Sequence, residues 1–177
     1  PGYEMMGDIG WVPSGAHGKI GPGSGVVSLP HGFHWEVPPN IDVVAETHFR
    51  PTGKIEQLSL SVDLFEDAIE GSRAVQEIVS MIRRIVIEAD DDAFVATEHL
   101  DIPIAVDVIG ITPRAGAECS GMNISSTNSE GTKQLLLSYS DWDPHYGETV
   151  FFTKPFRLMK GDTITSAWNF NNSDSNP

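Results

Sequence analysis

One histidine lies on a segment whose pattern could hold it in place for chemistry. Every second residue of 43–49 is apolar or threonine, whereas Glu46, His48 and Arg50 fall on the opposite side. This alternation predicts a half-buried strand over 41–50, which ends at the turn-forming sequence Pro-Thr-Gly. His48 would then stand between a carboxylate and a guanidinium on a stiff element. That arrangement suits a metal ligand and an ordinary surface histidine alike.

The other candidate ligands are scattered along the chain. His31 and His34 form an H-x-x-H pair in a segment rich in glycine and proline, with no third ligand nearby in sequence. His99 follows a glutamate and His145 follows an Asp-Pro pair, at spacings that favour no particular metal. Met122 offers a thioether, although its place in an alternating strand indicates a core position. We treat these five as weaker metal candidates than His48.

A cluster of carboxylates occupies Glu88–Asp92. Carboxylates can bind calcium, but this cluster lacks the spaced ligands and the turn glycine of a calcium-binding loop. The pattern therefore predicts a solvated turn, and calcium is not expected as a cofactor.

The elements that must position these residues are short strands. Residues 74–87 fit either a short helix or a buried strand. Apolar residues recur there at helical spacing, which favours a helix, and the stretch ends in consecutive apolar residues, which favour a strand. Polar or glycine-containing turns separate the other apolar stretches, which indicates a sandwich or a barrel. Besides 41–50, alternating or continuous apolar residues predict strands over 58–64, 102–111, 122–126, 134–139, 150–153 and 163–170.

Composition narrows the classes of function. The chain has 177 residues and a formal net charge of −14, which opposes binding to nucleic acid or to anionic lipid. No run of 18 apolar residues is present, so no membrane span is predicted. The single cysteine, Cys119, rules out an internal disulfide. The chain opens at Pro1, and we expect a processed product or a piece of something longer.

A series of landmarks resembles one family. In chain order they are Asp42–Lys54, Ile104–Pro113, Asp141–Asp143, Lys154–Leu158, Lys160–Asp162 and Asn171–Pro177. Together they resemble the copper type II, ascorbate-dependent monooxygenases, the family of peptidylglycine α-hydroxylating monooxygenase and dopamine β-monooxygenase, and especially its bacterial members.

The resemblance implies an all-β fold of two jelly-roll β-sandwiches packed side by side. Residues 1–72 would be the C-terminal part of the first domain, and 73–177 would be the second. The family holds one copper with three histidines in the first domain, and another with a His-x-His pair and a methionine in the second. These coppers activate dioxygen for C–H hydroxylation, and imidazole and thioether ligands suit the copper redox cycle. An extracellular or periplasmic location follows from the same resemblance.

The sequence departs from the family at the second copper site. His48 matches a first-site ligand, and we expect the other two histidines upstream of Pro1 and the methionine after Pro177. Where the family has His-x-His, however, this chain has Arg114 and Gly116. A guanidinium is never deprotonated in a protein, and glycine has no side chain to offer. The resemblance therefore implies an oxidoreductase scaffold whose second metal-binding site is degenerate.

Three functions follow as hypotheses. The first is a non-catalytic structural or binding part of a larger exported protein or assembly, with other protein chains or domains as partners. The second is a copper monooxygenase completed by segments or chains that are not present in this sequence. The third is a carbohydrate- or calcium-binding sandwich. In that case Trp142, Tyr146 and Trp168 would stack on sugars and Asp141 and Asp143 would hold an ion, although Trp142 also fits a core anchor.

Overall fold

The described part of the chain is all-β. The computed structural model describes residues 26–37, 39–40, 52–55, 57, 59, 61–66, 70–82, 84–144 and 148–173. These residues contain eight strands and no helix, which confirms the predicted fold class. The chain divides into two units, one of Pro1–Pro30 with Glu77–Pro177 and one of His31–Gln76. The predicted jelly-roll domains, 1–72 and 73–177, stay a prediction.

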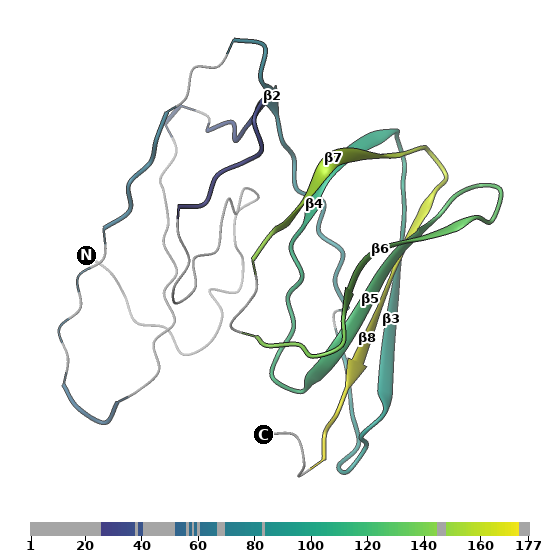
Figure 1. The fold of residues 1–177 in the computed structure, drawn as a ribbon. Coiled ribbons are helices and arrows are strands. Elements are labelled where there is room, and N and C mark those ends of the chain that lie inside the picture. Colours follow the sequence, from purple (N-terminus) through teal and green to yellow (C-terminus); the bar gives the residue numbers. More distant parts are fainter. Residues whose placement is uncertain are drawn as a thin grey trace. The chain divides into compact units, whose positions relative to one another are not determined.

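The larger unit contains two antiparallel sheets (Figure 1). The four-stranded sheet has the order β3-β8-β5-β6, and the two-stranded sheet pairs β4 with β7. Neither sheet closes into a barrel, so the arrangement is that of a β-sandwich. The strands are β3 (Phe94–Asp101), β4 (Val106–Ile111), β5 (Cys119–Thr127), β6 (Lys133–Tyr139), β7 (Val150–Leu158) and β8 (Thr163–Phe170).

The smaller unit has two very short strands, β1 (Phe33–His34) and β2 (Arg73–Ala74), which pair in parallel. The Arg73 guanidinium carbon lies 4.7 Å above the centroid of the Phe33 ring, a cation–π contact between the two strands.

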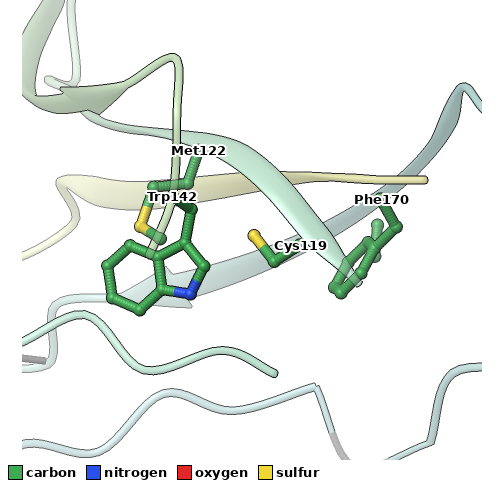
Figure 2. Close-up of a cluster of buried hydrophobic side chains, with 5 residues drawn as sticks. Cys119, Met122, Trp142 and Phe170 are labelled. Carbon is green, nitrogen blue, oxygen red and sulfur yellow. The ribbon is translucent and has the colours of Figure 1, made fainter. Parts of the chain in front are cut away.

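The core lies on one face of the four-stranded sheet. Met122, in the central strand β5, is fully buried and is paired with Trp168 of β8 and Tyr139 of β6. Figure 2 shows Met122 with Cys119, Trp142 and Phe170 in one buried cluster. The Trp142 and Tyr139 rings meet edge to face, with centroids 5.7 Å apart. Alternation along β5 and β8 therefore sends apolar side chains to this face and mostly hydroxyl or amide side chains to the other.

Four of the predicted strands are confirmed. The stretches 122–126, 134–139, 150–153 and 163–170 lie in β5, β6, β7 and β8. The turn between β5 and β6 is held by Asn128, whose Oδ1 accepts hydrogen bonds from the amides of Glu130 and Thr132 at 3.1 and 2.8 Å. The strand predicted over 41–50 lies outside the described residues.

Two predictions about elements were wrong. The strand predicted over 58–64 is absent from its described residues, 59 and 61–64, because no described strand lies beside them to complete a ladder; Leu64 is 65% exposed there. Residues 75–82 and 84–87 form neither helix nor strand, and Ile85 and Ile87 pack against the core from an irregular segment.

The strand predicted over 102–111 is confirmed in part, because 106–111 form β4 whereas 102–105 form no strand. Ile102 is buried in the turn between β3 and β4 instead. Its amide donates to the carbonyl of Asp162 at 2.8 Å, and its carbonyl accepts from the amide of Gly161 at 2.9 Å. A contact with a turn distant in sequence therefore replaces the strand ladder at this position.

Candidate functional site

The loop between β4 and β5 carries the positions where the resemblance places the second copper ligands. Arg114 is exposed, Ala115 is half-buried against the core, and Gly116 is exposed. The indole N–H of Trp142 donates to the carbonyl of Ala115 at 3.3 Å, and the amide of Cys119 donates to the carbonyl of Gly116 at 3.3 Å. The buried indole therefore holds this backbone against the core and leaves positions 114 and 116 facing outward.

Neither of these positions carries a side chain that can coordinate a metal cation. Arg114 presents a permanent positive charge, which repels a metal cation. A Cβ atom added at Gly116 would lie 2.8 Å from Glu118 Oε2, the mobile end of a side chain. Met122 is fully buried in the core.

His99 lies on the outer face of the four-stranded sheet. Its Nδ1 is 3.1 Å from Oγ1 of Thr165, its cross-strand partner in β8. Two residues along β3, on the same face, Oδ1 of Asp101 accepts a hydrogen bond from Oγ1 of Thr163 at 2.8 Å. The imidazole and the carboxylate are both exposed, and each is oriented by a threonine of the neighbouring strand.

The remaining histidines fall in different places. His31 is exposed in the turn before β1, and Nδ1 of His34 lies 2.8 Å from Oγ of Ser72. The structure thus gives the imidazole of His34 a serine hydroxyl as its partner. His48 and His145 lie outside the described residues. Within the described ranges, no group of three or more His, Cys, Asp or Glu side chains has the geometry of a metal site.

The acidic cluster forms the predicted turn. The amide of Asp91 donates to the carbonyl of Glu88 at 3.3 Å, and Asp90 has a φ of 63°. Oδ1 of Asp91 accepts from the amide of Ala93 at 3.1 Å, so this carboxylate caps the turn. Asn172 bonds to the same segment through its main chain and its amide side chain.

The aromatic residues considered for sugar stacking are placed differently from one another. Trp142 is 7% exposed and belongs to the core, and Trp168 is half-buried against that core. Tyr146 lies outside the described residues. Asp141 is exposed, and Asp143 is half-buried.

A groove that the sequence reasoning did not anticipate lies between β6 and β7. It has a volume of about 450 Å³ and is open to solvent. The sequence contains two apolar runs that contribute residues to the groove, Leu135–Leu137 and Phe151-Phe152. That they lie near each other in space could not be inferred from the sequence. Leu135, Leu136, Phe151, Phe152, Lys154 and Phe156 contribute to its walls.

Comparison of the chain with protein-family models and with curated proteins found no match. The resemblance to copper monooxygenases therefore remains a prediction from the sequence landmarks. Among the described residues, no helix has the length and apolar character needed to cross a membrane.

Proposed function

We propose that this chain is a non-catalytic β-sandwich module, with the scaffold of the copper monooxygenases, that serves as a structural or binding part of a larger exported protein. One observation carries the proposal. The two outward positions of the β4–β5 loop hold a guanidinium and a glycine, and the loop backbone is bonded to the core beneath them.

The chemistry of copper supports this interpretation. A redox copper needs several imidazole or thioether ligands around one point, because a single ligand gives a weak and open site. Position 114 supplies a permanent cation and position 116 supplies no side chain. The thioether of Met122 is buried in the core on the inner face of β5.

The scaffold itself supports a binding or architectural role. The larger unit has a well-formed core around Met122 and Trp142, and its two sheets end in β6 and β7, which each pair with only one described strand. Strand edges and an open groove between them are features through which β-sandwiches contact other chains.

Competition for Cu(I) against a chromophoric chelator such as bicinchoninate tests the proposal. We expect the unaltered chain to leave the chelator complex intact, because the loop offers no soft ligands. The double variant Arg114→His with Gly116→His should withdraw copper, since it places two imidazoles on one side of the loop. Glu118 can move aside for the new side chain at 116.

The outcome that overturns the proposal is removal of one equivalent of Cu(I) by the unaltered chain. The double variant serves as the positive control, and Arg114→Ala serves as the control for loss of charge alone. Circular dichroism of each variant establishes that the sheets are retained.

A further inference from the structure

We propose that His99 and Asp101, on the outer face of the four-stranded sheet, form an exchangeable site for a divalent transition-metal cation of the Zn²⁺ type. This inference does not rest on the proposed function, because it concerns a different face and different residues.

The strand geometry places the two side chains on one face of the sheet. His99 and Asp101 are two residues apart in β3, so their side chains leave the same face of the sheet. Both are exposed, whereas Ala96, on the inner face of β3, is buried. An imidazole and a carboxylate are ligands that Zn²⁺ uses in proteins, with Zn–N and Zn–O distances of about 2.0–2.2 Å.

Each ligand is oriented by a second residue. In the tautomer whose Nδ1–H donates to Thr165 Oγ1, the lone pair of Nε2 is available to a metal. The hydroxyl of Thr163 holds Oδ1 of Asp101, and Oδ2 takes no partner among the described residues. Hydrogen bonds of this kind fix the tautomer and rotamer of metal ligands and raise their affinity.

In the antiparallel register, each of the two ligands lies opposite the threonine to which it is hydrogen-bonded. His99 is directly opposite Thr165, and Asp101 is directly opposite Thr163. Both side chains are therefore bonded to the same strand, β8, on the same face of the sheet. The net charge of −14 favours a divalent cation at such a place. Two protein ligands leave the other coordination positions to water, which makes the site exchangeable.

Isothermal titration of the full chain with ZnCl₂ at neutral pH tests this inference. We expect one set of binding heats that is lost in His99→Ala and weakened in Asp101→Asn, which keeps the contact with Thr163 but replaces a carboxylate by an amide. Thr165→Val should weaken binding by about tenfold, because it removes the partner that orients the ring.

His31→Ala is the matched control, since it removes an exposed histidine from a turn in the smaller unit. It should bind Zn²⁺ as the unaltered chain does. NMR of the histidine rings gives a second readout that needs no variant to fold: the His99 signals should shift as Zn²⁺ is added. Unchanged His99 signals, or a His99→Ala titration equal to that of the unaltered chain, would refute the site. A Cu(I) result at the β4–β5 loop has no bearing on this outcome, because Cu(I) prefers softer ligands than a carboxylate.

Discussion

At the scale of single residues, the thiol of Cys119 shows how packing changes chemistry. Cys119 is 2% exposed beside Met122 and Phe170, and burial raises the pKa of its thiol. The thiolate is the reactive form, so the folded protein keeps this cysteine inert.

The raised pKa has a consequence for stability at alkaline pH. In the unfolded chain the thiol ionises at its ordinary pKa, whereas the folded chain holds the proton to higher pH. The stabilisation is therefore fully present below the ordinary pKa and is lost as pH rises through the raised one. Urea unfolding between about pH 8 and about pH 10 should show a steeper fall in the free energy of unfolding for the unaltered chain than for Cys119→Ala. Equal falls in the free energy of unfolding for the two proteins would contradict the raised pKa of the Cys119 thiol.

The sequence predicted the place of a single residue where that place depends on the residue's near neighbours in the chain. Met122 was expected in the core from the alternation of β5, and its full burial follows from that alternation. The partner of His99 could not be inferred, because Thr165 is 66 positions away and only the β3–β8 register brings it near. The same holds for the indole of Trp142, which reaches the carbonyl of Ala115 across 27 positions.

At the scale of elements, the turn between β7 and β8 is built around a buried carboxylate. Asp162 is 6% exposed, and its Oδ2 accepts a hydrogen bond from the amide of Met159 at 2.8 Å. Its own amide donates to the carbonyl of Met159 at 3.1 Å, and Gly161 takes a φ of 92° that favours glycine. The carbonyl of Asp162 also accepts a hydrogen bond from the amide of Ile102. This bond joins the turn to the one after β3.

Asp162→Ala should lower the free energy of unfolding by about 2 kcal/mol, because a hydrogen bond to a charged group is lost and the Met159 amide is left without its acceptor. Asp92→Ala, which removes an exposed carboxylate from the acidic turn, should change it by less than about 0.5 kcal/mol. Denaturant titration followed by tryptophan fluorescence measures both. If the two variants were equally stable, the turn would not depend on the buried carboxylate.

The pairing of β4 with β7 gives a second test at this scale. The register shifts between Val108 and Gly110, where β7 bulges away from β4. A Cβ atom at Gly110 would lie 2.9 Å from the carbonyl oxygen of Val150 and from Cδ1 of Phe151. Gly110→Ala should therefore destabilise the unit by about 1–3 kcal/mol through overpacking.

Gly116→Ala is the matched comparison, because its Cβ would meet only the mobile end of Glu118. Thermal unfolding of the two alanine variants should rank Gly116→Ala close to the unaltered chain and Gly110→Ala well below it. The reverse ranking would mean that the β4–β7 contact is looser than its backbone indicates.

Sequence patterns predicted the strands that lie in β5, β6 and β8, because each has a continuous alternating or apolar run with a turn at its end. They failed for the described residues of 58–64 and for Ile102, where the outcome depends on which distant segment supplies hydrogen-bonding partners. Local alternation specifies which face a residue prefers, but a strand also needs a neighbour. The long bulge in β7 could not be predicted either, because it depends on the register with β4 and not on the residues of β7 alone.

At the scale of the whole molecule, the chain is acidic, its described residues are all-β, and its larger unit has a β-sandwich core. The class of fold was predictable because it depends on many short patterns together. The proposed function depends on a few positions. At two of these, 114 and 116, the sequence departs from the family that it resembles, and the structure adds that a backbone bonded to the buried Trp142 carries them.

The most direct test of the central claim is the copper content of the unaltered chain. The purified protein would be loaded with excess Cu(I) under reducing, anaerobic conditions, passed through a desalting column, and measured for copper against protein by mass spectrometry of the elements. The account predicts a ratio close to zero, because an exposed arginine and a glycine cannot retain the metal. Retention of one copper or more per chain would contradict it.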